Sequence, residues 1–195
     1  KLSLCAYQNA NKVTALFEYA RSLQLELGCP EEKTLVVPNG IDGSRFENIP
    51  GKTEEDKAFF NIGAVLRIAP IKDVKTLLNA FYYAKQRESS LKLWIMGPWE
   101  EDDPYAKEVF ALAKSLEVPD VIFTGRIQVT DYLGRMDATI LSSISEGQPL
   151  TILEGFAAKC PAIATNVGNC EGLIYGEGND TLGDAGIVTD TMSVS

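Results

Sequence analysis

"ATILSSISEGQPLTILEGFAAK" (residues 138–159) joins two apolar segments through a loop that contains glycine and proline. The first segment, 138–144, is a short apolar run and predicts a buried strand. The second, 149–159, carries apolar residues at helical spacing and predicts a helix. Pro149 stands at its start, where proline is favoured because the missing N–H would have no partner in the first turn anyway. The stretch therefore predicts a strand, a loop and a helix in direct succession.

The same alternation of strands and helices extends over most of the chain. Further strands are predicted at 58–65, 91–97, 121–125, 161–167 and 185–190, and further helices at 74–82, 106–116, 129–136 and from Cys170. This pattern predicts the α/β fold class, with a Rossmann-like, doubly wound parallel sheet. Ligands of such sheets bind outside the carboxyl ends of the strands. We therefore expect Gly63, Gly97, Gly125, Glu146 and Gly168 to line one rim.

Residues 1–45 depart from this pattern. Apolar residues from Val13 to Leu27 fall at helical spacing and end at a glycine, so a helix is predicted there. A short strand at 34–37 and a polar loop at 43–56 are predicted to follow. We expect residues 1–45 to connect the sheet to another domain.

Composition excludes several classes of function. The chain has 195 residues, a net charge of −9 and no histidine. Contacts to nucleic-acid phosphates need clustered lysine and arginine, so no nucleic-acid partner is expected. The absence of histidine excludes Ser-His-Asp and Cys-His catalysis and every histidine metal site. The four cysteines are scattered without a Cys-x-x-Cys pair, which predicts free thiols and a cytoplasmic location.

The loop before the helix at 149–159 has the features of an anion site. Gly147 lets a ligand approach the backbone, and the free amides from Leu150 to Ile152, together with the helix dipole, suit a phosphate. Glu154 lies roughly 7.5 Å along the helix, about the distance from a nucleotide's terminal phosphate back to its ribose. Glu146 would meet a sugar attached to that phosphate. Taken alone, two such glutamates are more often solvated surface charges.

Two cations accompany this anion site in "LRIAPIKD" (66–73), which follows the strand at 58–65. Arg67 and Lys72 flank a proline-containing loop, and in isolation they would also be ordinary solvated charges. On the same rim as an anion site, they could neutralise a pyrophosphate, Arg67 by bidentate contact and Lys72 as a point charge. The Gly-x-Gly-x-x-Gly and P-loop patterns are absent, which disfavours dehydrogenases and P-loop NTPases.

Together these motifs resemble the C-terminal, donor-binding domain of GT-B retaining glycosyltransferases of family 4 (group 1). The resemblance rests on "PNGID" (38–42), the Arg67 and Lys72 pair, "EGQPLTILE" (146–154) and "AIATNVGNCEGLI" (162–174). "PIKDVKTLL" and "SISEGQPLTILEGFAA" are most similar to the Pel exopolysaccharide glycosyltransferase subgroup. Leu66 and Asp73 stand where the wider family usually has glycine.

The resemblance implies transfer of a sugar, UDP-glucose being the favoured donor, with retention of configuration in polysaccharide or glycoconjugate synthesis. It implies catalytic roles for Arg67, Lys72 and Glu146. It implies that the donor is held by Gly97, Arg126, Ile127, Gly147, Gln148, Pro149, Leu150, Thr151 and Glu154. The base would lie near Gly97 and the backbone of Arg126 and Ile127, and Glu154 would hold the ribose. The resemblance implies no metal and no cofactor besides the donor substrate.

The resemblance also predicts the organisation of the chain. Residues 1–45 would be the last helix and connector of a missing N-terminal acceptor domain, and residues 46–195 the donor domain, truncated at its C-terminus. Such a fragment would bind nucleotide without transferring sugar. Apolar surface near Ile174 and Ile187 would be exposed and promote self-association. The family also admits peripheral association with a membrane polysaccharide synthesis complex.

Two other functions remain open at this point. One is a non-catalytic nucleotide-binding module, against which the retention of both glutamates and both cations argues. The other is a different GT-B activity, such as a sugar-nucleotide epimerase or a phosphorylase. Neither Lys75 nor Lys159 lies in a motif recognisable as a pyridoxal phosphate site.

Overall fold

A computed structural model describes residues 2–176 and 183–194. It divides the chain into two compact units, Lys1–Gly40 and Ile41–Ser195. The division predicted from the sequence falls after residue 45, whereas Ile41 and Phe46 here pack in one cluster of the second unit.

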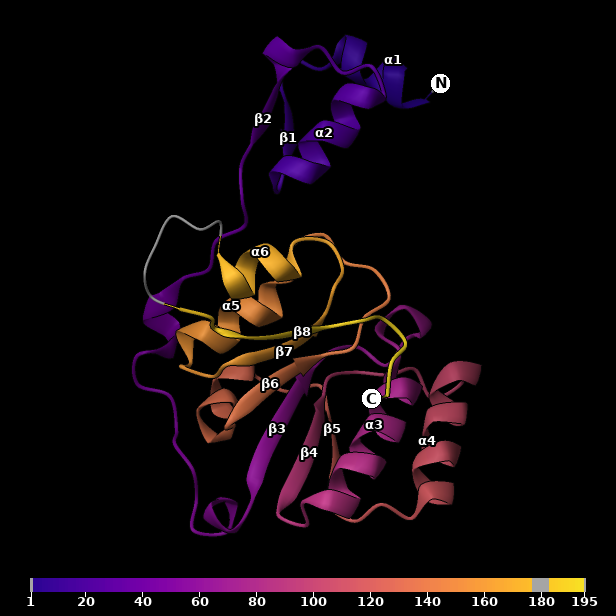
Figure 1. Ribbon diagram of the computed structural model, residues 1–195, viewed down its shortest axis with the longest axis vertical. Helices are drawn as coiled ribbons and strands as arrows, with labels where there is room; N and C mark the ends of the chain where they lie inside the picture. The colour runs from indigo at the N-terminus through magenta and orange to yellow at the C-terminus, as the bar shows by residue number, and fades with distance from the viewer. Residues whose placement is uncertain (1, 177–182, 195) are drawn as a thin grey trace. The chain divides into compact units, whose positions relative to one another are not determined.

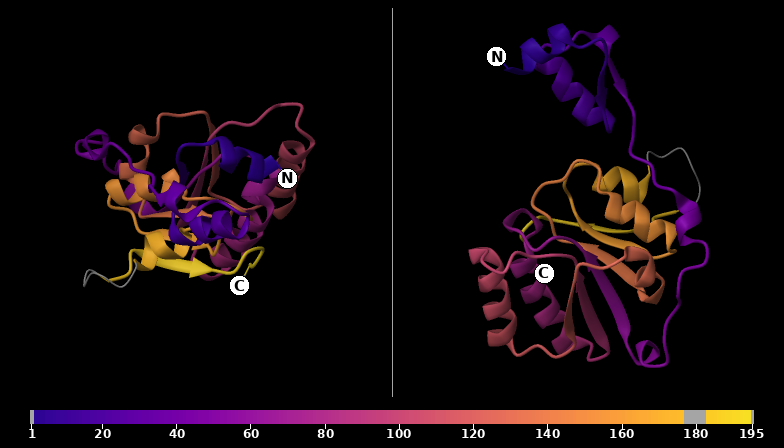
Figure 2. Two further views of the ribbon diagram at one scale, coloured as in Figure 1. Left: turned by 90° about the horizontal axis from the view of Figure 1, so that it is seen from above. Right: turned by 180° about the vertical axis from the view of Figure 1, so that it is seen from behind.

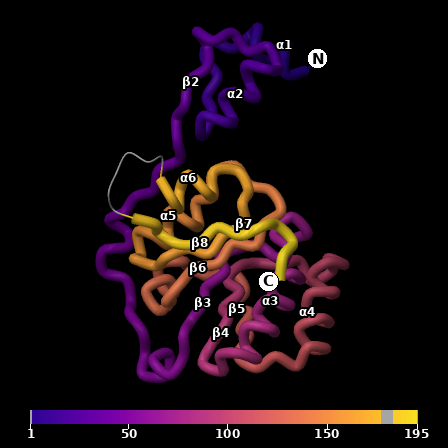
Figure 3. Tube along the Cα trace, in the orientation of Figure 1, coloured from indigo at the N-terminus to yellow at the C-terminus, as the bar shows by residue number. Residues whose placement is uncertain are grey.

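The first unit pairs two short parallel strands beside its helices. Its elements are α1 (Leu2–Asn9), β1 (Val13–Ala15), α2 (Glu18–Glu26) and β2 (Thr34–Val36), traced in Figure 3. The predicted helix from Val13 is therefore wrong over its first turn. Val13 pairs with Thr34 and Ala15 with Val36, and this ladder holds the segment extended. The helix begins only at Glu18, after Phe17 in an extended conformation.

The second unit is built on a six-stranded sheet in which every neighbouring pair is parallel (Figure 1). Its strands are β3 (Phe60–Val65), β4 (Leu91–Met96), β5 (Val121–Gly125), β6 (Ala138–Leu141), β7 (Ala162–Thr165) and β8 (Gly186–Thr189). They lie in the order β5-β4-β3-β6-β7-β8. The predicted α/β class and doubly wound parallel sheet are confirmed. Strand β6 ends at Leu141, so residues 142–144 belong to the following loop.

The helices of this unit are α3 (Val74–Arg87), α4 (Pro104–Leu116), α5 (Leu150–Ala157) and α6 (Cys170–Tyr175). The strand order advances in one direction from β3 to β5 and in the opposite direction from β6 to β8. Because crossovers between parallel strands are right-handed, this reversal puts the two helix pairs on opposite faces of the sheet (Figure 2). The predicted helix at 129–136 consists of two 3₁₀ turns, Val129–Asp131 and Leu133–Arg135.

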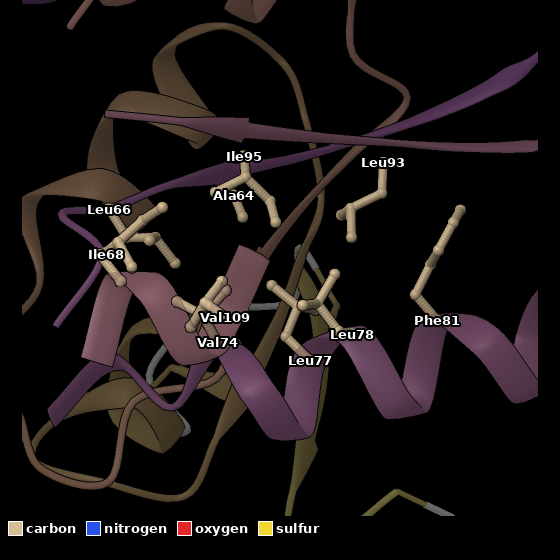
Figure 4. Close-up of a cluster of buried hydrophobic side chains, with 11 residues drawn as sticks. Ala64, Leu66, Ile68, Val74, Leu77, Leu78, Phe81, Leu93, Ile95 and Val109 are labelled. Atoms are coloured by element: carbon tan, nitrogen blue, oxygen red, sulfur yellow. The ribbon is translucent and has the colours of Figure 1, made fainter. Parts of the chain in front are cut away.

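Each helix pair covers its own core. Leu78, Phe81 and Val109 from α3 and α4 pack on Leu93 and Ile95 of β4 (Figure 4). On the other face, residues of α5 and α6 pack on β6 and β7. Ile174 of α6 belongs to this second core and is 1% exposed, so its predicted exposure is wrong. Ile187 is 60% exposed, as predicted.

Two expectations about loops need correction. Gly63 lies within β3 and not at its end, and a Cβ there would come within 2.7 Å of the Met96 side chain. The segment predicted as a polar loop at 43–56 is fastened to the domain. It carries Phe46 in a 3₁₀ turn, and both Phe46 and Asp56 are buried. Two buried side chains therefore attach this segment to the domain, although its sequence is mostly polar.

Candidate donor-binding site

A pocket of about 310 Å³ opens at the carboxyl ends of β3, β4 and β5. Its lining includes six residues that the sequence singled out: Arg67, Lys72, Gly97, Arg126, Ile127 and Thr151. Strands β3 and β6 are neighbours whose crossovers run in opposite directions, and such a switch point is where open α/β sheets bind ligands. A second cavity, of about 240 Å³, lies between α3 and the strands β6 and β7 and contains none of the predicted site residues.

Gly97 shapes the floor of the first pocket. It has φ of +152°, and a Cβ there would lie 1.9 Å from the carbonyl oxygen of Leu66. The chain after β4 thus approaches the chain after β3 more closely than any side chain would permit. Leu66 is itself buried and belongs to the core under α3.

The pocket concentrates positive charge in an acidic chain. Three of its lining residues, Arg67, Lys72 and Arg126, are cations, although the chain's net charge is −9. Arg67 and Arg126 are exposed, and neither guanidinium forms an ion pair with a carboxylate of residues 2–176 or 183–194. Unpaired guanidinium groups in a concave site are suited to bidentate contact with phosphate.

Lys72 is paired differently, because its ammonium contacts the Glu146 carboxylate. The same oxygen, Glu146 Oε1, accepts a hydrogen bond of 2.6 Å from Ser143 Oγ. Two further bonds join these loops: Ser142 Oγ donates to the Lys72 carbonyl over 2.8 Å, and Ile144 N–H to the Ile71 carbonyl over 2.8 Å. The loop after β6 and the turn before α3 are therefore held together as one unit.

Asp73 explains how the chain turns from Lys72 into α3. It has φ of +45°, a left-handed conformation in which glycine is favoured and aspartate is better tolerated than most residues. Its Oδ1 accepts a hydrogen bond from the Thr76 N–H and caps the helix. Its other oxygen, Oδ2, is buried without a hydrogen-bond partner among the described residues. The aspartate thus adopts a left-handed conformation at some conformational cost and supplies the cap.

Helix α5 begins at Leu150, so Pro149 is the capping residue and not the first helical one. Pro149 forms no side-chain hydrogen bond to the start of the helix. The N–H groups of the first turn therefore need other acceptors, such as backbone carbonyls or a bound ligand. The preceding Gly147 carbonyl accepts a 2.8 Å bond from the Asn169 N–H. Gln148 is buried. These contacts hold the loop 146–149 beside the start of α5, where Thr151 lines the pocket.

Glu154 is half-buried on α5, and burial raises the pKa of its carboxyl group, while the nearby Arg45 charge opposes that rise. No hydrogen bond or ion pair to its carboxylate is present among the described residues. Glu154, Glu146 and residues 147–150 are not among the residues that line the 310 Å³ pocket, so the structure brings together only part of the predicted set.

Sequence reasoning missed two residues of this region. Ser143, which is fully buried, holds Glu146, and the only available signal was its place at the end of a predicted strand. Arg45 was assigned to a polar loop, yet its charge acts on Glu154. In the described part of the chain, no group of three or more carboxylate or thiol side chains could hold a metal ion. No helix in that part is long and apolar enough to cross a membrane.

Comparisons with known proteins agree with this fold. TuaC of Bacillus subtilis (strain 168), whose name assigns it to teichuronic acid biosynthesis as a glycosyltransferase, is 42% identical over 145 residues, 71% of this chain and 34% of TuaC. The D-inositol 3-phosphate glycosyltransferase of Kineococcus radiotolerans is 26% identical over 186 residues, 87% of this chain and 42% of that protein. The chain thus spans well under half the length of these relatives.

Solved structures show the same fold. A glycosyltransferase from Rickettsia africae superposes with a TM-score of 0.81 at 21% identity, covering 100% of this chain and 54% of that one. HepE of Anabaena, solved with UDP and glucose, superposes with a TM-score of 0.78 at 20% identity, covering 97% of this chain and 52% of HepE. The family model "Glycosyl transferases group 1" matches residues 58–191, more than half of the sequence, and the chain therefore belongs to the group 1 glycosyltransferases.

Proposed function

We propose that this chain is the donor-binding domain of a retaining glycosyltransferase that uses a nucleotide diphosphate sugar, with UDP-glucose as the favoured donor. HepE, which has the same fold, was solved in complex with UDP and glucose, and TuaC is named for teichuronic acid biosynthesis. These likenesses, with the Pel-like motifs, support a role in polysaccharide or glycoconjugate synthesis. The four unbridged cysteines support a cytoplasmic location.

The observation that carries the proposal is that one pocket of an acidic chain holds two guanidinium groups, those of Arg67 and Arg126, and that neither pairs with a carboxylate of the described residues. They would hold the diphosphate together with Lys72 and the first amides of α5. Breaking the bond between sugar and diphosphate places negative charge on the leaving phosphate. Fixed cations and amides stabilise that charge more in the transition state than in the ground state, which is what accelerates the step.

The remaining residues would orient the donor. The base would lie along Gly97 and Ile127, which line the pocket, and Thr151 would lie near the phosphates. Glu154 would accept hydrogen bonds from the ribose hydroxyls, which fits a half-buried carboxylate that has no hydrogen-bond or ion-pair partner in residues 2–176 and 183–194. Glu146 and the backbone of residues 147–150 would hold the sugar. The proposal assigns no role to a metal, a cofactor or a covalent enzyme intermediate.

The acceptor would be held by another domain of the same polypeptide, to which residues 1–45 would lead. Transfer needs that domain, because bringing acceptor and donor together and excluding water account for several kcal/mol of the barrier. The isolated chain would therefore bind nucleotide and transfer no sugar.

Titration calorimetry of this chain against UDP, GDP, ADP, uridine and UDP-glucose tests the donor assignment. We expect UDP and UDP-glucose to bind and uridine to bind far more weakly. A longer version of the protein, incubated with labelled UDP-glucose and acceptors, tests transfer, and NMR of the anomeric proton in the product tests retention. No binding of any nucleoside diphosphate, or transfer by the 195-residue chain alone, would contradict the proposal.

A further inference from the structure

The contact between Lys72 and Glu146 has a consequence for donor selection. Lys72 lines the pocket, yet without a ligand its charge is already matched by the Glu146 carboxylate. The two side chains are 25% and 14% exposed, so water screens them only in part. A diphosphate bound at Lys72 would bring additional negative charge close to Glu146. That arrangement is unfavourable unless Glu146 gains donors of its own.

We propose that Lys72 and Glu146 form an exchange pair, in which the donor's diphosphate takes Lys72 and the released Glu146 carboxylate takes hydroxyl groups of the attached sugar. The proposal rests on the assignment of this pocket to a nucleotide diphosphate sugar. It adds that the diphosphate and the sugar of the donor are recognised together, because the two residues that bind them are partners in the ligand-free state. A diphosphate alone provides a partner only for Lys72, and a sugar alone provides one only for Glu146.

Ser143 is the positioning residue for this exchange. Its side chain is fully buried, and its carbonyl accepts a 2.6 Å bond from Thr165 Oγ, which fixes it in the loop directly after β6. The 2.6 Å bond from Ser143 Oγ to Glu146 Oε1 does not depend on Lys72. When Lys72 turns to the diphosphate, Ser143 keeps the carboxylate in place, and its remaining acceptor sites are open to sugar hydroxyls.

The exchange discriminates the intact donor from the product nucleotide. UDP removes Lys72 from Glu146 and returns nothing to the carboxylate, whereas UDP-glucose supplies both a diphosphate and hydroxyl donors. The ligand-free pair therefore competes with UDP more than with the sugar nucleotide. After transfer, reformation of the pair favours release of UDP.

The test compares affinities of the 195-residue chain and its variants for UDP, inorganic pyrophosphate and UDP-glucose by calorimetry at fixed ionic strength. Glu146→Gln removes the competing charge at nearly constant shape, so UDP and pyrophosphate should bind about tenfold more tightly. The preference for UDP-glucose over UDP should fall by a similar factor. Glu146→Ala should show the same two effects and replaces Glu146→Gln in the test if that variant folds poorly.

Two variants serve as comparisons. Ser143→Ala should lower the preference for UDP-glucose over UDP while leaving UDP affinity within about twofold, because it acts only through Glu146. A merely structural defect would weaken both ligands alike. Glu108→Gln removes a charge from the surface pair with Lys75, 2.7 Å apart, and should change neither affinity.

The outcomes separate this inference from the function on which it rests. If wild type binds UDP and UDP-glucose but both Glu146 variants bind UDP no more tightly, the exchange is wrong and the donor site stands. If the wild-type chain binds no nucleoside diphosphate and no pyrophosphate, both are wrong. Tighter UDP binding with an unchanged preference for the sugar nucleotide would also overturn the exchange.

Discussion

Asp56 and Arg135 form a bidentate ion pair, with Nε to Oδ2 at 2.8 Å and Nη2 to Oδ1 at 2.9 Å. Asp56 is 1% exposed and also accepts bonds from the N–H and hydroxyl of Thr53. The Arg135 guanidinium lies 4.7 Å from the centre of the Trp94 ring. The pair therefore ties the segment before β3 to the 3₁₀ turn before β6.

Asp56→Ala should destabilise the chain by about 3–5 kcal/mol, because it leaves a partly buried guanidinium without its partner. Chemical denaturation at pH 7 measures this as a lower midpoint. Glu54→Ala, which removes an exposed carboxylate of the same turn from its pair with Lys57, should cost less than about 1 kcal/mol. Equal losses of unfolding free energy in the two variants would show that the buried ion pair contributes no more to stability than the exposed one.

The pH dependence of that loss follows from the direction of the pKa shift. The Arg135 guanidinium holds the pKa of Asp56 well below its usual range. A carboxyl group with a lowered folded-state pKa contributes stability above its unfolded pKa, about 3.9, and loses it as pH falls through the lower value. The difference between wild type and Asp56→Ala should therefore persist from neutral pH to about pH 4 and shrink below that.

The sheet could be predicted from the sequence because doubly buried strands are continuous apolar runs and each is followed by a helical stripe. Pairings across long stretches of chain carry no such local signal. Asp56 and Arg135 are 79 positions apart, and Lys72 and Glu146 are 74 apart. Val13 was assigned to a helix because its spacing to Leu16 and Phe17 fits one, while its partner Thr34 lies on another strand.

The pocket was predicted in part for a related reason. Parallel strands bring their carboxyl ends to one edge, so Arg67 and Gly97 could be expected on one rim, whereas Arg126 was expected there only from the family resemblance. Local side-chain contacts, such as Ser143 with Glu146, depend on how the loops fold and left no pattern in the sequence. The position of Glu146 in the loop before α5 was predictable, whereas its contact with Ser143 was not.

Arg67→Ala and Arg126→Ala should each weaken UDP binding by roughly 10- to 100-fold and leave uridine binding nearly unchanged. Both guanidinium groups line the pocket without a carboxylate partner among the described residues, and under the proposed function we expect them to contact the phosphates of UDP. Lys72→Ala should also weaken the binding of UDP, although part of that loss arises because Glu146 is left without its cation. Calorimetry measures these affinities.

Lys75→Ala is the matched control for these substitutions. It removes a cation from the first turn of α3, three residues after Lys72, but outside the pocket. UDP affinity should stay within about twofold of wild type, because a charge beyond the site acts only through solvent. If Lys75→Ala weakens UDP as much as Arg67→Ala does, the effect is one of net charge and the assigned contacts are wrong.

Glu154→Gln should stabilise the ligand-free chain near neutral pH while weakening UDP. Burial raises the pKa of this carboxyl group, so the folded state binds the proton more tightly than the unfolded state. The resulting stability is fully present below the unfolded pKa, about 4.3, and is lost as pH rises through the folded value. Melting curves of the two proteins should therefore converge near pH 4 and separate above it. A lower melting temperature for Glu154→Gln at pH 7 would contradict this reading.

Thiol labelling should distinguish one cysteine from the other three. Cys5 is exposed, whereas Cys29, Cys160 and Cys170 are buried. Burial raises the pKa of Cys160 and of Cys170 to about 11, so at pH 8 only on the order of 0.1% of each would be thiolate. A thiol reagent should modify one site of the native chain rapidly, and Cys5→Ser should abolish that phase. Rapid modification of Cys160 would show that the Leu133–Arg135 turn, whose Leu133 carbonyl accepts the Cys160 thiol bond, opens readily.

Gly168→Ala should impair donor binding although residue 168 does not line the pocket. Gly168 has φ of +57°, and a Cβ there would lie 2.1 Å from the Gly147 carbonyl oxygen and 2.5 Å from that of Glu146. Backbone atoms cannot rotate away as a side chain can, so the loop that leads into α5 must shift. We expect at least tenfold weaker binding of UDP-glucose, because a shift near 1 Å misplaces both the α5 amides and Glu146.

Gly51→Ala provides the comparison, since a Cβ at residue 51 meets no atom within 4 Å. It should leave the affinity for UDP-glucose unchanged. The melting temperature of Gly168→Ala should fall as well, because both the left-handed φ and the close contact are unfavourable for alanine. Wild-type affinity in a Gly168→Ala protein that melts normally would mean that the loop 146–149 moves without affecting the donor, and the role given to that loop would have to be withdrawn.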